Sequence, residues 1–254
     1  MSEVRATNYD AIADSYDRRY AFQRYEGIVE TVLGFVGSGC AAVLEVGCGT
    51  GHWLQLLDGR VTRVAGMDVS ANMLARAAAT APRAWLVRGR TEAAPWIDGA
   101  FDRIVCINAL HHFTSREQFF AEARRMLRQG GGLLTVGLDP HAGRDSWWVY
   151  DYFPETIAID RARFAPVRII RGELAKAGFS WAESAEAHHI ESQRLLTEVF
   201  PQGIDRAITS QLVVLSDDEF SRGAQRIAEA SRTSGGDLPL VADLRFYATT
   251  GWVG

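Results

Sequence analysis

The stretch AAVLEVGCGTG, residues 41–51, decides the fold of this chain. A short apolar run that ends in glycines is typical of a strand buried on both faces of a parallel sheet. The glycines allow a sharp turn and let the backbone approach a ligand closely. The free N–H groups at the start of the next helix favour a negatively charged ligand group. The stretch therefore predicts a first strand, a ligand-binding loop and a helix.

Strand-like and helix-like segments alternate on both sides of this loop. Apolar residues recur at helical spacing in residues 28–36, 53–57, 73–77 and 119–127, and short apolar runs occupy residues 64–69, 85–87, 101–107 and 133–136. Ser70 and Ser115 are predicted N-caps, and Gly130-Gly131-Gly132 is predicted to end the last of these helices. Five strands that alternate with helices predict a doubly wound parallel sheet.

The second half of the chain has a less regular pattern. It predicts a helix that ends at Gly178, a sixth strand within residues 179–190, a helix capped by Ser216 and Glu219, and a closing strand over residues 244–252. Two stretches, about 139–166 and 191–240, lack the alternation. We therefore predict a single α/β domain over residues 1–254, with a mostly parallel, seven-stranded, Rossmann-like sheet and helical cap insertions at those two stretches.

An acidic residue ends the second predicted strand. Asp68 follows Gly47 by 21 residues, and a carboxylate at this place can accept both hydroxyls of a ribose. The dinucleotide fingerprint G-x-G-x-x-G requires a third glycine where this chain has His52. The glycines instead read G-x-G-x-G, and Glu45 precedes them by two residues.

Together these motifs resemble the class I S-adenosylmethionine (SAM)-dependent methyltransferases. The loop is similar to their E/D-x-G-x-G-x-G motif. YDAIADSYD at 9–17 resembles the Y-D-x-x-A-x-x-Y-D opening of the small-molecule branch that includes quinone-biosynthesis enzymes. NALHHF at 108–113 and LRQGG at 127–131 are similar to that branch's fourth-strand ending and its turn before strand five. The resemblance covers residues 8–138 well and the remainder loosely.

The resemblance implies that SAM is the cofactor and S-adenosylhomocysteine (SAH) the product. The loop backbone would hold the methionine part, with Glu45 near its ammonium; Asp68 would take the ribose, and Tyr16 would close over the cofactor. Many relatives carry an acidic residue where this chain has Arg90. A backbone carbonyl or Glu92 would therefore bind the adenine edge in place of that acidic residue. The implied cofactor-binding residues are Tyr16, Glu45, Gly47, Cys48, Gly49, Gly51, Asp68, Val69, Met73, Arg90, Thr91, Glu92 and Asn108.

Candidate acceptor residues follow the fourth and fifth strands, where ligands bind in open α/β sheets. His111 and His112 come just after strand four, and His112 is the candidate general base near neutral pH. The aromatic run after strand five predicts an apolar pocket. Ordinary core packing is the alternative for these rings. The candidate substrate residues are His141, Trp147, Trp148 and Tyr152.

Composition limits the classes of partner that this chain is expected to bind. The net charge is −4 with no basic stripe, which argues against nucleic acid, and no apolar run reaches the roughly 20 residues of a membrane span. The three cysteines lack metal-ligand spacing, and the adjacent pair His188-His189 points to opposite faces of a strand, so we predict no metal site. A polar N-terminus and an odd cysteine count predict a cytoplasmic protein.

We therefore predict an enzyme that transfers a methyl group from SAM to an O, N or C atom of a small molecule. Two alternatives share its loop. A protein that binds SAM without methyl transfer would keep every cofactor motif. A nicotinamide-dependent oxidoreductase would keep Asp68 but should have a glycine at position 52, which is His52 here.

Overall fold

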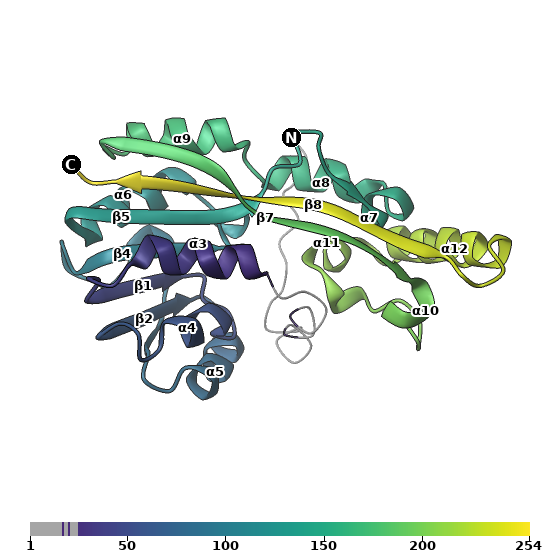
Figure 1. The fold of residues 1–254 in the computed structure, drawn as a ribbon, viewed down its shortest axis with the longest axis horizontal. Coiled ribbons are helices and arrows are strands. Elements are labelled where there is room, and N and C mark those ends of the chain that lie inside the picture. Colours follow the sequence, from purple (N-terminus) through teal and green to yellow (C-terminus); the bar gives the residue numbers. More distant parts are fainter. Residues whose placement is uncertain (1–16, 18–19, 21–24) are drawn as a thin grey trace.

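A computed structural model describes Asp17, Tyr20 and residues 25–254, and within them eight strands form one sheet (Figure 1). The order is β3-β2-β1-β4-β5-β8-β6, and β7 also pairs with β8. The first five strands are parallel, whereas β8 runs antiparallel to β5, β6 and β7. The strands are β1 (Ala42–Val46), β2 (Arg63–Asp68), β3 (Trp85–Arg88), β4 (Phe101–Ile107), β5 (Leu127–Leu138), β6 (Ser146–Trp147), β7 (Trp181–Leu195) and β8 (Pro239–Trp252).

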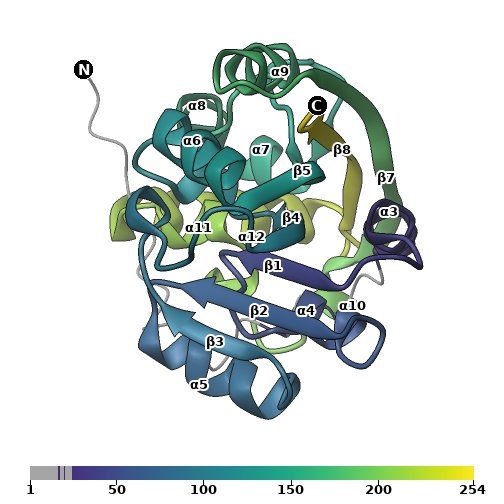
Figure 2. The same ribbon diagram turned by 90° about the vertical axis from the view of Figure 1, so that its left-hand side faces the viewer.

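Helices cover both faces of the parallel part (Figure 2). One face packs against α3 (Glu26–Val36), α4 (His52–Leu57) and α5 (Ala71–Thr80), and the other against α6 (Arg116–Met126) and α9 (Val167–Lys176). Successive side chains of β1 pack on opposite faces of the sheet. Val43 lies in one hydrophobic cluster with Ile28 of α3, and Leu44 lies in the other with Phe120 of α6. All five residues of β1 are buried, as a strand covered on both faces requires.

The β7–β8 pair continues well past the parallel strands (Figure 1). Strand β5 ends at Leu138, opposite Phe246, while β7 and β8 stay paired as far as Leu195 and Pro239. At about 3.3 Å per residue, the seven residues 239–245 extend roughly 23 Å beyond the carboxyl end of β5. We call this part, residues 189–195 with 239–245, the ribbon extension.

Several short helices and one long helix, α12, come before and after the strands of the ribbon extension. After β5 come α7 (Trp148–Tyr152) and α8 (Glu155–Arg163), and between β7 and β8 come α10 (Leu196–Val199), the 3-10 turn η3 (Arg206–Ile208), α11 (Ser210–Val213) and α12 (Asp217–Thr233). Helix α8 contacts α11, and α7 contacts α12. The two stretches that lacked strand–helix alternation therefore meet in space.

Most local predictions are confirmed. The Ser70 hydroxyl accepts from the Met73 N–H at 3.1 Å, Ser115 caps α6, and Ser216 with Glu219 forms the predicted capping box of α12. Gly178 has a positive φ just after α9.

Two local predictions are wrong. The described sheet has eight strands rather than seven, because Ser146 and Trp147 pair with Asp243 and Ala242 of β8. The glycines 130–132 do not end a helix, because α6 already ends at Met126 and Leu127 begins β5 opposite Phe101. No helix in the described part of the chain is long and apolar enough to cross a bilayer.

Candidate functional site

The glycine loop joins β1 to α4, and its first glycine has no room for a side chain. Gly47 has φ +73°, and a Cβ there would lie 2.4 Å from the Cβ of Ala109. Gly51, with φ +85°, caps α4 and would bring a Cβ within 3.0 Å of the Ala77 backbone. The loop can therefore turn tightly against the end of β4 only because these positions lack a Cβ.

Asp68 at the end of β2 holds the loop from the next strand. One carboxylate oxygen accepts from the Gly49 N–H at 2.9 Å, and the other accepts from the Ser70 N–H at 2.9 Å. An ionised carboxylate offers about four acceptor positions. Each oxygen can therefore keep its backbone bond and still accept from a ligand hydroxyl.

We expect Asp68→Asn to weaken SAH binding by about 1.5–3 kcal/mol, or roughly 10–150-fold, because it removes the charge from a hydrogen-bonding group. Isothermal titration calorimetry measures the change. Asp58→Asn is the control, since Asp58 pairs with Arg83 after α4, away from the loop. Equal SAH affinity in the wild type and Asp68→Asn would remove Asp68 from the ligand site.

Glu45 is a fully buried carboxyl group in β1. Neither of its oxygens makes a hydrogen bond of normal geometry to the described residues. Burial raises the pKa of Glu45 well above its ordinary value, and the charge of Asp68 raises it further, while the nearby Leu54 N–H lowers it by less. A buried acceptor without a partner beside the loop is the type of group that a ligand donor would satisfy.

This raised pKa predicts a pH-dependent stability difference. The folded state holds the Glu45 proton more tightly than the unfolded state does. The contribution of this group to the wild-type free energy of unfolding is therefore fully present below its unfolded pKa and is lost as the pH rises. Relative to the wild type, Glu45→Gln should therefore gain stability between pH 5 and pH 8, by at most about 1.4 kcal/mol per pH unit. Thermal unfolding without ligand measures this, with the exposed Glu229→Gln as control. A pH-independent difference would mean that Glu45 is ionised in the fold.

The remaining predicted adenine-side residues differ in exposure. Val69 is 56% exposed beside the loop, whereas Met73 is buried. The Arg90 guanidinium donates to the Thr114 hydroxyl at 3.2 Å and pairs with the Glu92 carboxylate at 3.6 Å. Thr91, in the 3-10 turn η1 (Thr91–Ala93), is buried. Cys48 is also buried, and its N–H donates to the Met67 carbonyl.

Two described residues before α3 contact the loop or the start of α4: Asp17, which ends the 9–17 motif but was given no role there, and Tyr20, which sequence reasoning missed. The Thr50 hydroxyl donates to Asp17 at 2.6 Å. The Tyr20 ring stacks on His52 with centroids 3.5 Å apart. His52, the residue that replaces the dinucleotide-type glycine, thus has a packing role. Tyr16, the predicted closing residue, lies outside the described residues.

A cavity of about 190 Å³ opens next to the carboxyl end of β4. Asn108, which follows β4 with φ +52°, lines it together with His111 and His112 of the 3-10 turn η2 (Leu110–His112). The His111 ring stacks on Phe164, with centroids 3.9 Å apart. The ribbon extension supplies one wall of the cavity, and α10, η3 and α11 contribute further lining residues.

The structure brings most of the predicted acceptor residues to this cavity. Trp147 and Trp148 line it together with His112, whereas His141 and Tyr152 are not among its lining residues. His141 Nε2 lies 3.0 Å from the Phe164 carbonyl, so it packs behind a lining residue. No group of three or more His, Cys, Asp or Glu side chains gathers for a metal within the described ranges.

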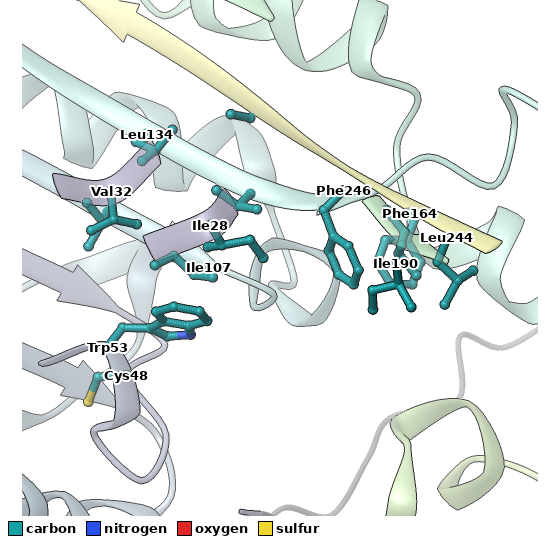
Figure 3. Packing of buried hydrophobic residues seen from close by; sticks show 14 of the residues in the cluster. Ile28, Val32, Cys48, Trp53, Ile107, Leu134, Phe164, Ile190, Leu244 and Phe246 are labelled. Carbon is teal, nitrogen blue, oxygen red and sulfur yellow. The ribbon is translucent and has the colours of Figure 1, made fainter. Parts of the chain in front are cut away.

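Other lining residues come from β7 and β8, which sequence reasoning did not select. Figure 3 shows Phe164, Ile190, Leu244 and Phe246 gathered on one side of the strands. Alternate residues of each strand face the cavity, at 190, 192 and 194 in β7 and at 240, 242, 244 and 246 in β8. The sequence shows that alternate residues of a strand share one face. It does not show that 190–194 and 240–246 face a cavity, because that depends on how far β7 and β8 stay paired.

Comparison with known proteins identifies the family. A family model described as a methyltransferase domain matches residues 44–135. A Mycolicibacterium smegmatis protein named as an S-adenosylmethionine-dependent methyltransferase is 31% identical over 136 residues, which cover 53% of this chain and 51% of that protein. An uncharacterised methyltransferase of Geobacillus thermodenitrificans is 32% identical over 168 residues, covering 64% of this chain and 74% of its own length. The chain belongs to the SAM-dependent methyltransferases.

A solved structure agrees with this methyltransferase in fold. The protein, named as a methyltransferase from an antibiotic biosynthesis pathway of Anabaena variabilis, matches with a TM-score of 0.69 and 22% identity over 87% of this chain and 96% of that one. The chain matches about half the length of the M. smegmatis relative. None of these names refers to quinone biosynthesis, so that part of the resemblance stays a prediction.

Proposed function

We propose that this methyltransferase moves the methyl group of SAM to an oxygen, nitrogen or carbon atom of a small apolar molecule. The observation that carries the proposal is the cavity beside Asn108 and His112, whose walls are largely aromatic and aliphatic. It adjoins the strand end that packs against the glycine loop, since Ala109 lies against Gly47. An apolar cavity with a few polar groups is the usual form of a small-molecule site.

The residues around the loop fit SAM. The turn from Gly47 to Gly51, which ends at the N-terminus of α4, suits the methionine carboxylate, and the buried Glu45 suits its ammonium group. Asp68 offers remaining acceptor positions to the ribose, and the exposed Val69 offers an apolar face to the adenine. We propose Thr91 and the backbone of Asn108 as further contacts.

Bound SAM supplies an activated methyl group on a sulfonium. The protein then acts mainly by holding the acceptor atom in line with that group, an effect worth roughly 7–11 kcal/mol in well-oriented reactions. When SAM is bound, an electron pair of the acceptor would form the new bond to its methyl carbon, and the electrons of the broken carbon–sulfur bond would stay on sulfur. We assign His112 to take a proton at a ring nitrogen where the acceptor atom carries one.

We further propose that stretches 139–166 and 191–240, apart from the residues 191–195 and 239–240 that belong to β7 and β8, act as one cap over the acceptor within a single domain. The contacts of α8 with α11 and of α7 with α12 support this. A cytoplasmic location is also proposed, and the free thiols of Cys40, Cys48 and Cys106 support it.

The test compares acceptor use with cofactor binding. Candidate acceptors are screened by SAH release, and kcat and KM are then measured for Trp148→Phe, Trp148→Ala and His112→Ala. We expect Trp148→Ala to raise the acceptor KM by roughly 10-fold or more, the scale of a buried aromatic anchor. SAH affinity should stay nearly unchanged. His112→Ala should lower kcat by roughly 10²–10⁴-fold if the acceptor must lose a proton.

Trp181→Ala is the matched control, because Trp181 is 54% exposed on β7 and does not line the cavity. Trp148→Phe keeps an aromatic ring, so it separates loss of the acceptor contact from loss of folding. The proposal fails if no acceptor yields SAH above background, or if Trp148 and Trp181 variants behave alike.

A further inference from the structure

The middle of the ribbon extension has a depression that faces the acceptor cavity. Ser192 of β7 lies opposite Ala242 of β8, and both line the cavity. The larger lining residues on either side are buried: Ile190 and Leu244 are each 5% exposed, and Leu240 is 3% exposed. Ser192 and Ala242 are only half-buried, although their side chains are smaller. The space over this pair is therefore open, and we call it the central depression.

The helical side of the cavity does not require a polar ligand. Val199 of α10 and Ile208 of η3 are aliphatic lining residues. The hydroxyls of Thr209 and Ser210 both donate to the side-chain oxygen of Gln211, whose Nε2 donates in turn to a buried carboxylate of α8 at 3.0 Å. Because these polar groups already have partners within the protein, an apolar ligand beside them leaves none of them unsatisfied.

The cavity is long relative to its volume. Phe246 lies opposite Leu138 at the carboxyl end of β5. At about 3.3 Å per residue, Ala242 lies roughly 13 Å further along β8 and Leu240 roughly 20 Å. All three of these β8 residues line the same cavity, which has a volume of about 190 Å³. A volume this small, spread over such a length, fits an extended chain better than a fused ring system.

We propose that the acceptor carries an unbranched alkyl chain that runs along the ribbon extension and through the central depression, away from the methylated atom. This inference rests on the proposed function and names its substrate class. Ser192 and Ala242 are then specificity residues, because their small side chains leave the passage open. A larger side chain at either position closes the passage and shortens the chain that the cavity accepts.

The experiment measures the affinities of two uncharged n-alkanols, hexanol and dodecanol, for the full chain saturated with SAH. From the β4 end of the cavity, hexanol is too short to reach the central depression, whereas dodecanol extends into it. Tryptophan fluorescence follows binding, because Trp147 and Trp148 line the cavity. Each buried methylene should raise the affinity about three- to fourfold, so we expect dodecanol to bind at least about 100-fold more tightly than hexanol.

Ala242→Leu and Ser192→Leu should each weaken dodecanol binding by about tenfold or more, since the chain can no longer bury its last methylenes. Hexanol binding and SAH affinity should stay unchanged, which also shows that the variants remain folded. Val241→Leu is the matched control and should bind both alkanols like the wild type. Val241 neighbours Ala242 in β8, but it is 38% exposed and is not among the lining residues of the cavity.

The inference is overturned if dodecanol binds the wild type no more tightly than hexanol does. It is also overturned if both leucine variants keep the wild-type affinity for dodecanol, or if they weaken the two alkanols equally. Failure of the proposed function has a different signature. In that case the alkanols bind as expected, but no acceptor of any chain length yields SAH above background.

Discussion

We expect Gly47→Ala to destabilise the protein by about 2–5 kcal/mol and to abolish measurable SAH binding. The left-handed backbone at φ +73° costs an alanine about 1–2 kcal/mol. Its Cβ would also lie 2.4 Å from the Ala109 Cβ, and such overpacking adds about 1–3 kcal/mol. The clash falls between the glycine loop and the residue that follows Asn108, so relief would displace the proposed site itself. Urea unfolding and SAH calorimetry measure the two effects.

Gly130→Ala separates the two causes. Gly130 has nearly the same φ, +72°, but a Cβ there meets no atom within 4 Å. It should therefore lose only about 1–2 kcal/mol from backbone strain and bind SAH normally. If both variants lose equal stability, the contact between Gly47 and Ala109 is not tight, and the loop has more room than the structure indicates.

The glycine loop was predictable because its signals are local. An apolar run, alternate glycines and an acidic residue at the end of the next strand lie within residues 41–68, and each has a direct backbone consequence. The helix caps at Ser70, Ser115 and Ser216 were predictable for the same reason. They depend on residues three apart and on no distant contact.

The acceptor cavity was only partly predictable because strand pairing over long distances builds it. Trp147 and Trp148 could be selected as an aromatic pair after strand five. The cavity role of Arg194 follows only once β7 is known to stay paired with β8 as far as Leu195. The sequence predicts residues 191–195 as part of a cap insertion because stretch 191–240 lacks the strand–helix alternation, and this is wrong, since the five residues continue β7. Register, rather than composition, turns Ser192 and Arg194 toward the cavity.

A buried polar cluster links the two halves of the proposed cap, and it predicts a second large effect. Asp160 of α8 is fully buried and accepts from Arg163 at 2.7 Å, from Tyr150 at 2.9 Å and from Gln211 of α11 at 3.0 Å. Burial raises the pKa of Asp160, although its three donors favour the charged form. Gln211 also lines the cavity, so this carboxylate supports the cavity wall from behind.

We expect Asp160→Asn to cost about 3–5 kcal/mol of unfolding free energy, because it leaves the buried Arg163 without its counter-charge. The Arg163 Nε and Nη1 atoms already lack hydrogen-bond partners among the described residues, so the guanidinium has no alternative acceptor nearby. Urea unfolding measures the loss. The acceptor KM should rise as well, since the carboxylate that accepts from Gln211 is replaced, while SAH affinity in the folded fraction should change little.

Asp217→Asn provides the comparison that decides this point. Asp217 also pairs with an arginine, Arg206, at 2.6 Å, but its side chain is 95% exposed. Exposed ion pairs contribute about 0–1 kcal/mol, so this variant should remain close to the wild type. A cost for Asp160→Asn no larger than that for Asp217→Asn would mean that water reaches the cluster. The link between α8 and α11 would then have to come from apolar contacts, with Leu212 of α11, itself fully buried, as the first residue to replace.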